Sequence, residues 1–285
     1  MRRLRAAGLL PAALLACGLA AAAGPERVEV PPPPSSPAPL VGHLFRPAGA
    51  GPHPAVVMMH GCGGAYTRDG ALSSRHAFWG EQLAARGYVA LMLDSFTSRG
   101  LREICTIRIG SRPIRESDRV ADANAALAFL RNLPGVRSDR IGLIGWSHGG
   151  GTVLTTMARA QPDEGGFRAA VAMYPGCGAR AKNADRFHPY APVLLIIGEA
   201  DDWTPAAPCR ELVAAVAARG EPMSIVTYPD TYHGFDTPSL TAARVRTEVP
   251  NGVNPGRGVT VAPNPEARED ALRRVGEFFG RALAP

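Results

Sequence analysis

Three signatures are missing from this sequence of 285 residues, and each absence narrows the function. The chain has no clustered lysine and arginine face, which argues against nucleic acid as a partner. It has no G-x-x-x-x-G-K-[ST] motif, so its run of three glycines at 149–151 is not a phosphate-binding loop. It also has no C-x-x-C pair, and its dispersed cysteines do not predict a zinc site. The sequence implies no metal, nucleotide or organic cofactor.

Composition and length indicate one globular domain. Hydrophobic residues make up 46% of the chain and charged residues 20%, which excludes general disorder. α/β proteins of this length commonly form a single domain around one core. The formal net charge of +6 falls to 6 − 3 = +3 if the three arginines at positions 2, 3 and 5 are removed with a targeting segment. Charge therefore says little about partners.

The first residues are typical of an export signal. Residues 1–5 are positively charged, and residues 6–16 are apolar but too few to span a bilayer permanently. Leu-Leu-Ala-Cys at 14–17 resembles a bacterial lipobox, in which residues 1–16 are removed and Cys17 is lipidated. Ordinary cleavage near Ala23 is the alternative. We expect an exported protein, lipid-anchored through Cys17 at the periplasmic face of a bacterial membrane, or otherwise soluble in the periplasm or secreted.

A proline-rich tether is expected over residues 17–39. Four consecutive prolines at 31–34 favour a stiff, extended chain that would hold a domain away from a membrane. Residues 27–30 could instead form a first edge strand that the prolines end. We place the catalytic domain at residues 40–285.

Short apolar runs then alternate with amphipathic segments. The apolar runs predict strands over residues 40–46, 55–60, 88–93, 141–144, 169–174, 192–197 and 223–228. The amphipathic segments predict helices over residues 77–86, 118–133, 149 onward, 206–218 and 265–283. Residues 237–264 lack periodicity and are expected to form a loop. The alternation predicts an α/β fold with a mostly parallel sheet and helices on both faces.

A nucleophile elbow lies between the strand at 141–144 and the helix after it. Residues 145–149 read Gly-Trp-Ser-His-Gly, which matches G-x-S-x-G in the required strand-to-helix context. Gly145 and Gly149 leave room where a side chain would collide with the neighbouring chain. The motif predicts Ser147 as a nucleophile exposed above the sheet.

Further candidate groups follow other strands. In α/β-hydrolases the serine, acid and histidine come in that chain order, each at the carboxyl end of a strand. Asp201 or Asp202 follows the strand at 192–197, and His233 follows the last strand. After the strand at 55–60 the chain reads His-Gly-Cys-Gly-Gly, similar to the H-G-G-G-type loop of esterases that supplies an oxyanion-binding N–H.

With these motifs the chain resembles the dienelactone hydrolase family of α/β-hydrolases over residues 40–283. The resemblance is carried by L-F-R-P, H-G-C-G-G, D-S-F-T-S-R-G, G-W-S-H-G-G-G, G-E-A-D-D-W-T-P and Y-H-G-F. It implies the α/β-hydrolase fold and Asp201 as the acid, with Asp202 a surface or capping residue. The name-giving enzymes carry cysteine where this chain has Ser147, so general hydrolysis of a small-molecule carboxylic ester is expected.

The resemblance also implies the roles of the groups in acyl transfer to water. Ser147 attacks the ester carbonyl, His233 transfers the proton, and Asp201 orients the imidazole. The backbone N–H groups of Cys62 and His148 bind the oxyanion. The substrate is expected to contact Arg99, in the arginine-rich loop after residue 93, and Trp146.

Four cysteines remain after Cys17, and an even number in an oxidising compartment predicts disulfides. Spacing leaves three pairings open. In the strand order that the resemblance implies, the strands before Cys62 and Cys105 are neighbours, as are those before Cys177 and Cys209. We therefore expect these two pairs to be bonded.

Two other functions fit the same motifs. A peptidase or acyltransferase uses the same triad on the same fold, because the triad does not choose its leaving group. A non-catalytic surface lipoprotein that binds a ligand in a vestigial cleft is the alternative outside enzymes, although such proteins usually lose a member of the triad.

Overall fold

The computed structural model describes residues 24–34, 36–158 and 165–284. The expected signal peptide and the lipidation site Cys17 lie outside these residues. Within the described ranges, no helix combines the length and the apolar character needed to cross a membrane.

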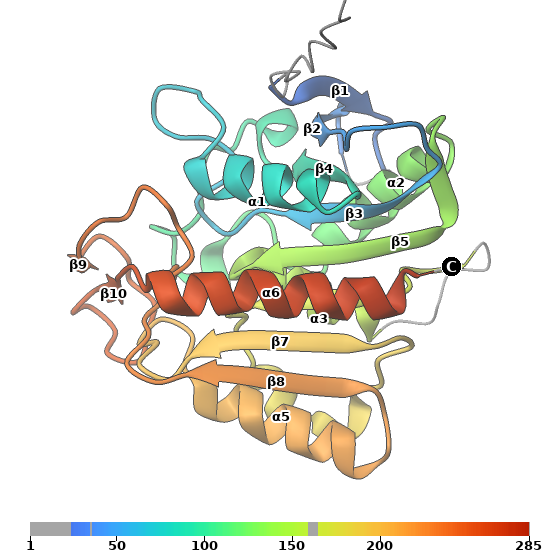
Figure 1. The fold of residues 1–285 in the computed structure, drawn as a ribbon. Helices are drawn as coiled ribbons and strands as arrows, with labels where there is room; N and C mark the ends of the chain where they lie inside the picture. The colour runs from blue at the N-terminus through green and yellow to red at the C-terminus, as the bar shows by residue number, and fades with distance from the viewer. Residues whose placement is uncertain (1–23, 35, 159–164, 285) are drawn as a thin grey trace, which may run out of the picture.

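An eight-stranded sheet forms the centre of the molecule, in the order β1-β2-β4-β3-β5-β6-β7-β8 (Figure 1). Six neighbouring strands pair in parallel, in the order β4, β3, β5, β6, β7 and β8. At the β4 edge, β2 pairs antiparallel with β4, and β1 pairs antiparallel with β2. The bounds are β1 Glu26–Val30, β2 Leu40–Phe45, β3 His53–Met59, β4 Val89–Asp94, β5 Val136–Trp146, β6 Ala170–Met173, β7 Val193–Gly198 and β8 Met223–Tyr228. The expected α/β-hydrolase fold is confirmed.

The start of the domain differs from the expected boundary. Strand β1 pairs with β2 along its whole length, from Glu26 opposite Leu44 to Val30 opposite Leu40. The expectation of a tether is therefore wrong for residues 26–30, and the edge-strand alternative is right. Val30 is fully buried, so apolar burial at the end of β1 holds this segment on the sheet.

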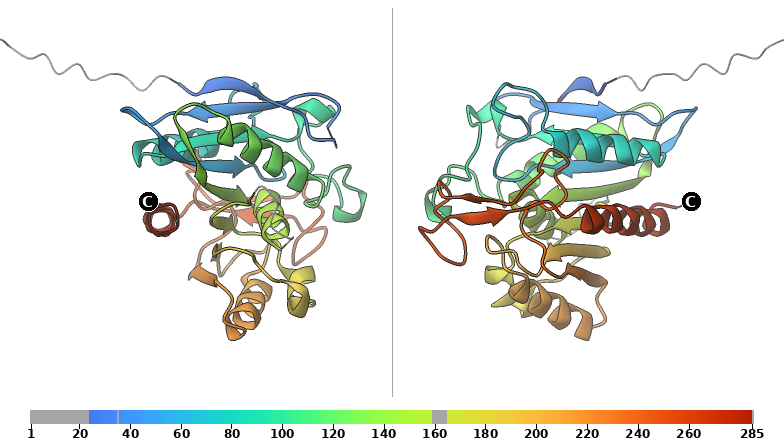
Figure 2. Two further views of the ribbon diagram at one scale, coloured as in Figure 1. Left: turned by 90° about the vertical axis from the view of Figure 1, so that its right-hand side faces the viewer. Right: turned by 60° about the vertical axis from the view of Figure 1, so that its left-hand side comes forward.

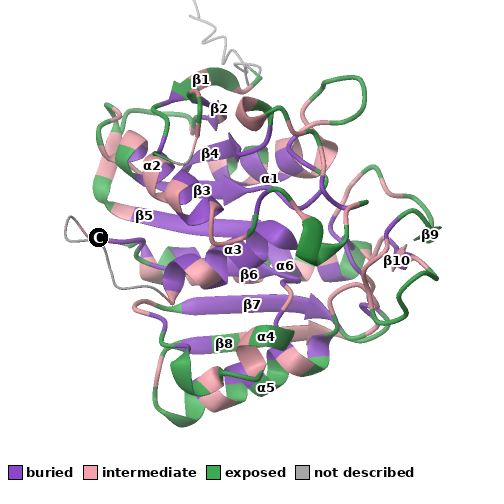
Figure 3. Ribbon diagram, turned by 180° about the vertical axis from the view of Figure 1, so that it is seen from behind, coloured by how far each residue is buried: buried purple, intermediate pink, exposed green. Residues whose placement is uncertain are grey.

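Helices cover both faces of the sheet. α1 (Ser74–Ala85) and α6 (Pro265–Ala282) lie on one face, while α2 (Arg119–Arg131), α3 (His148–Met157) and α5 (Ala206–Ala218) lie on the other (Figure 2). Shorter helices occupy the loops: η1 Thr97–Arg99, η2 Ile109–Ser111, α4 Gly178–Ala181 and η3 Ala184–Arg186. The central strands are buried throughout (Figure 3), as expected for parallel strands covered on both faces.

The segment expected to be a loop at residues 237–264 contains a small second sheet. β9 (Arg244–Arg246) pairs with β10 (Val259–Val261) in antiparallel register. These strands have three residues each, too few for the sequence pattern to reveal. Asp202 holds the segment in place, because its carboxylate accepts bonds of 2.8 Å each from the N–H and the hydroxyl of Thr260. We call residues 237–264 the flap.

Parallel strands deliver their following loops to one edge of the sheet. The arrowheads of β5, β7 and β8 point toward the side on which β9 and β10 lie (Figure 1). The elbow after β5, the acid loop after β7 and the histidine loop after β8 therefore meet there, beside the flap.

Candidate active site

The elbow has the geometry that its glycines predict. Ser147 connects the end of β5 to the start of α3 with φ 53° and ψ −115°, a strained conformation for a residue with a side chain. A Cβ on Gly145 would lie 2.4 Å from the carbonyl oxygen of Gly149, and a Cβ on Gly149 would lie 2.1 Å from that of Met59. Both distances are too short for any side chain, so glycine is required at both positions.

The acid and the histidine form a buried, hydrogen-bonded pair. Nδ1 of His233 donates to Oδ2 of Asp201 over 2.7 Å, and both residues are less than 5% exposed. The other carboxylate oxygen accepts from the N–H groups of Trp203 and Thr204, at 2.9 and 2.8 Å. The imidazole lies between the rings of Tyr174 and Trp203, with centroid distances of 4.6 Å to each. The ring orientation is thus fixed, and Nε2 is left for another partner.

Ser147 and His233 line the same cavity, which has a volume of about 250 Å³. Cys62 lines it as well. Ser147 is 9% exposed, and among the described residues its hydroxyl has no hydrogen-bond partner. The structure therefore brings the predicted triad serine and histidine to one small cavity, with the acid behind the histidine.

The expected oxyanion residues flank Ser147. A Cβ on Gly61 would lie 3.4 Å from that of Ser147, so the loop before Cys62 runs directly beside the elbow. His148 is the first residue of α3. In the described part of the chain, the N–H groups of Cys62 and His148 donate to no other protein group. Two donors next to the serine are thus available for an oxyanion.

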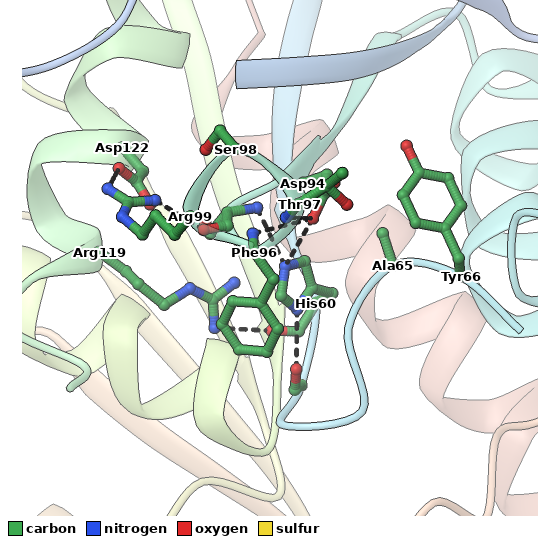
Figure 4. Close-up of polar contacts among 12 residues, drawn as sticks. His60, Ala65, Tyr66, Asp94, Phe96, Thr97, Ser98, Arg99, Arg119 and Asp122 are labelled. Atoms are coloured by element: carbon green, nitrogen blue, oxygen red, sulfur yellow. Dashed lines mark hydrogen bonds and ion pairs between the residues drawn. The ribbon is translucent and has the colours of Figure 1, made fainter. Parts of the chain in front are cut away.

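His60 holds the first of these loops from within. The N–H of Ser95 donates to Nε2 of His60 over 3.1 Å, so the ring proton is on Nδ1, which donates to the carbonyl oxygen of Gly61 over 2.7 Å (Figure 4). Burial, as the largest cause, holds the pKa of His60 well below its usual value. The residue is a neutral, structural part of the loop.

Both residues expected to contact substrate are placed elsewhere, and those expectations are wrong. Arg99 binds the buried carboxylate of Asp122 with two hydrogen bonds, of 2.7 and 3.1 Å (Figure 4). Trp146 is fully buried, and its indole N–H donates to Asp236 over 2.8 Å. Neither lines the cavity. Both follow or end a strand at the correct edge of the sheet, but each side chain satisfies a buried carboxylate.

Asp236 connects four parts of the site. The sequence motifs did not identify this residue. Its fully buried carboxylate accepts from the indole N–H groups of Trp79 and Trp146, both at 2.8 Å, and from the hydroxyl of Tyr174 at 2.7 Å. Nε of Arg75 lies 3.3 Å from the same carboxylate. Asp236 thus joins the histidine loop to α1, to the end of β6 and to the residue before Ser147.

Three arginines line the cavity and were also missed. They are Arg75 of α1 and Arg244 and Arg246 of the flap. Arg75 contacts Asp236, and Arg246 donates to Glu248 over 2.8 Å while its guanidinium lies 5.3 Å from the centre of the Trp203 ring. Arg244 makes no ion pair or hydrogen bond with other described residues through its side chain. The cavity wall therefore carries three guanidinium groups, two of which have an acidic partner.

The two disulfides have the expected pairing. Cys62 is bonded to Cys105, and Cys177 is bonded to Cys209. The first bond ties the loop beside Ser147 to the arginine-rich loop, and Cys105 also lines the cavity. In residues 24–34, 36–158 and 165–284, no cluster of three or more histidine, cysteine or acidic side chains could hold a metal ion.

Comparison with known proteins gives one family. The model of the dienelactone hydrolase family matches residues 40–283, which is most of the chain. One relative is a probable 2-oxo-3-(5-oxofuran-2-ylidene)propanoate lactonase of a Bradyrhizobium species, 24% identical over 209 residues, with 68% of this chain and 78% of the relative covered. Another is the quorum-quenching protein AidA of Acinetobacter baumannii, 26% identical over 225 residues. That match covers 71% of this chain but 64% of AidA, less than two thirds of its length.

Solved structures share the fold. Esterase 2 of Thermogutta terrifontis, phosphorylated by paraoxon, superposes with a TM-score of 0.64 at 20% identity, covering 93% of this chain and 97% of the esterase. At this identity the match shows the common fold and no more.

Proposed function

The chain belongs to the dienelactone hydrolase family and is a carboxylic ester hydrolase of that family, and from this premise we propose that it works through a Ser147-His233-Asp201 triad and an acyl-enzyme. The observation that carries the proposal is the buried 2.7 Å bond between His233 and Asp201, made by a histidine that shares a cavity with Ser147. A base held by a carboxylate and facing a serine on a strained elbow is the arrangement that nucleophilic acyl transfer needs.

In the proposed mechanism, Oγ of Ser147 attacks the ester carbonyl and Nε2 of His233 takes the proton. Asp201 keeps a proton on the other ring nitrogen, Nδ1, and stabilises the imidazolium. The N–H groups of Cys62 and His148 bind the oxyanion, each contributing about 3 kcal/mol of transition-state stabilisation. His233 protonates the leaving alcohol, and a water molecule, activated by the same imidazole, then releases the acid.

Turnover of short p-nitrophenyl esters tests this proposal. Ser147→Ala should lower kcat by at least about 10³-fold, because the nucleophile is lost while the fold is kept. Ser239→Ala removes another hydroxyl at the cavity and should keep most of the activity. A fluorophosphonate should label the wild type at Ser147 and should not label Ser147→Ala. Equal turnover by wild type and Ser147→Ala would refute the serine mechanism.

We also propose that the substrate is small and carries an anionic group. The cavity of about 250 Å³ limits size, and its lining includes Arg75, Arg244 and Arg246 but no aspartate or glutamate. The side chain of Arg244 makes no hydrogen bond or ion pair with the described residues, and a guanidinium in that state favours a carboxylate. The name of the lactonase relative describes a substrate of this kind, a lactone that carries a propanoate group.

The charge preference can be measured with a matched pair of esters. Arg244→Gln should raise KM for the anionic mono-p-nitrophenyl succinate about 10-fold or more, and it should leave KM for neutral p-nitrophenyl butyrate nearly unchanged. Arg257→Gln, which removes a flap arginine outside the cavity, is the control. An equal effect of Arg244→Gln on both esters would reject the role of this charge.

Export is part of the proposal as well. Two disulfides are expected of a protein that folds in an oxidising compartment, and residues 14–17 read as a lipobox. Metabolic labelling with palmitate should mark the wild type and not Cys17→Ser. Secretion of an unlabelled protein that begins near residue 24 would favour ordinary signal cleavage.

A further inference from the structure

Arg119 is a fully buried arginine between the two loops that flank Ser147. It begins α2, and its side chain reaches the start of the His60 loop (Figure 4). One nitrogen, Nη1, donates to the carbonyl oxygen of His60 over 2.8 Å and to Nδ1 of His148 over 3.0 Å. A single atom thus connects the loop after β3 to the first residue of α3.

The burial of this guanidinium is costly. No carboxylate lies within ion-pair distance of Arg119 among the described residues, and its Nε and Nη2 have no hydrogen-bond partner. The guanidinium carbon also lies 5.3 Å from the centre of the Phe96 ring. Burial is the main cause that lowers the pKa of Arg119 to about 10, so it is still protonated at neutral pH. Stability alone does not explain a buried, half-paired cation.

One bond of Nη1 acts two residues before the expected donor Cys62, and the other acts on the side chain of the expected donor His148. On one side it fixes the His60–Gly61 peptide through the carbonyl oxygen. The next peptide is fixed by Nδ1–H of His60, which donates to the carbonyl oxygen of Gly61 over 2.7 Å. A trans peptide is planar, with its N–H pointing opposite to its C=O. The direction of the Cys62 N–H is therefore set by two consecutive hydrogen bonds.

On the other side, Nη1 holds the ring of His148. Arginine is only a donor, so Nδ1 of His148 must be the acceptor and the ring proton must be on Nε2. Burial, as the largest cause, and the charge of Arg119 lower the pKa of His148 well below its usual value. The ring is thereby kept neutral in one tautomer, and the residue that carries the second donor is anchored.

We propose that Arg119 is a positioning residue for the oxyanion hole: it ties the Cys62 side of the hole to the His148 side, so that the two N–H groups converge beside Ser147. This inference rests on the proposed function. Donors that are held in place before the reaction need no reorganisation when charge develops on the substrate oxygen. Arg119 contacts neither substrate nor serine, and it acts through His60 and His148.

The test uses Arg119→Met, which keeps the length and apolar stem but removes every donor, and Arg119→Lys, which keeps a charge without the planar fork. Arg119→Met should lower kcat for p-nitrophenyl butyrate about 10- to 100-fold, less than the roughly 10²–10³-fold expected for outright loss of a donor. KM should change less than 3-fold, and fluorophosphonate labelling of Ser147 should slow in parallel with kcat. Arg119→Lys should retain more activity than Arg119→Met.

Leu130→Ala is the matched control. Leu130 is a fully buried core residue on the same helix, about 16 Å along the axis from Arg119. It should destabilise the fold without lowering kcat. Ring ¹⁵N NMR gives a readout that does not need turnover: His148 should show a protonated Nε2 and a bare Nδ1 in the wild type, and this preference should weaken in Arg119→Met.

The outcomes separate the two proposals. Unchanged kcat in a folded Arg119→Met whose His148 signal has shifted would overturn the positioning role and leave the triad untouched. An equal loss of kcat in Leu130→Ala would also overturn it, because the effect would then follow stability. A wild type that neither turns over esters nor reacts with the fluorophosphonate would overturn the proposed function and this inference together.

Discussion

Asp236 offers a sharp test of how the site is held together. Its carboxylate accepts hydrogen bonds from Trp79, Trp146 and Tyr174 and lies 3.3 Å from Nε of Arg75, all in a fully buried position. Asp236→Ala removes the acceptor and leaves three donors unpaired. Asp236→Asn keeps one acceptor oxygen and places an amide N–H₂ against donors that need an acceptor.

The magnitude follows from the count of donors. A buried polar group left without a partner costs about 1–3 kcal/mol, so three give a range of about 3–9 kcal/mol. Water that enters the space of the lost carboxylate can satisfy part of this, so we expect Asp236→Ala to lower the free energy of unfolding by about 3–5 kcal/mol. Asp236→Asn should cost less, about 1–3 kcal/mol, because one oxygen remains.

Equilibrium urea unfolding, followed by tryptophan fluorescence with the disulfides intact, measures these differences. Tyr174→Phe removes a single donor and keeps the carboxylate, so it should cost about 1.5–3 kcal/mol. The activity of Asp236→Asn should also fall, because Asp236 joins the histidine loop to the residue before Ser147. A loss below about 1 kcal/mol for Asp236→Ala would refute the view that this carboxylate organises the site.

Three further predictions concern other parts of the molecule. Burial lowers the pKa of His60, His76 and His148, and it lowers that of His76 to about 3. The unfolded chain therefore binds protons near pH 6.5 that the folded chain excludes. As a result, the free energy of unfolding should fall by about 3–4 kcal/mol when the pH is lowered from 7 to 5.5. A flat urea-unfolding profile across that range would contradict the neutral state of these rings. Gly149→Ala should give insoluble or inactive protein, because its Cβ would lie 2.1 Å from a backbone oxygen. The three atoms nearest to a Cβ on Gly151 belong to the side-chain carboxylate of Glu116, which can move if its ion pair with Arg180 shifts, so Gly151→Ala should stay soluble and active. Replacing Cys62 and Cys105 by alanine should lower kcat, and it should lower the free energy of unfolding by about 4 kcal/mol. The same change at Cys177 and Cys209 should lower stability without lowering kcat. Equal kcat in the two double variants would show that the Cys62–Cys105 bond has no special role in catalysis.

The sequence by itself determined the alternation of strands and helices and the chemistry placed at the strand ends. These features depend on short-range patterns. Apolar runs mark the buried parallel strands, and Gly145 and Gly149 mark a turn where backbone passes close to backbone. The order of Ser147, Asp201 and His233 along the chain follows from the same rule, because each group comes directly after its strand. Spacing alone left three disulfide pairings open, and the pairing followed only from the strand order that the family resemblance implied.

Only the tertiary structure decided which side chains face the cavity and which serve the core. Arg99 and Trp146 stand at the correct edge of the sheet in sequence, yet each binds a buried carboxylate contributed by a distant segment. Conversely, Arg75, Arg119 and Asp236 have no local pattern that marks them, because their partners lie on other loops and helices. A hydrogen-bonded network between segments far apart in the chain depends on how the layers pack, and periodicity along the chain carries no record of that packing.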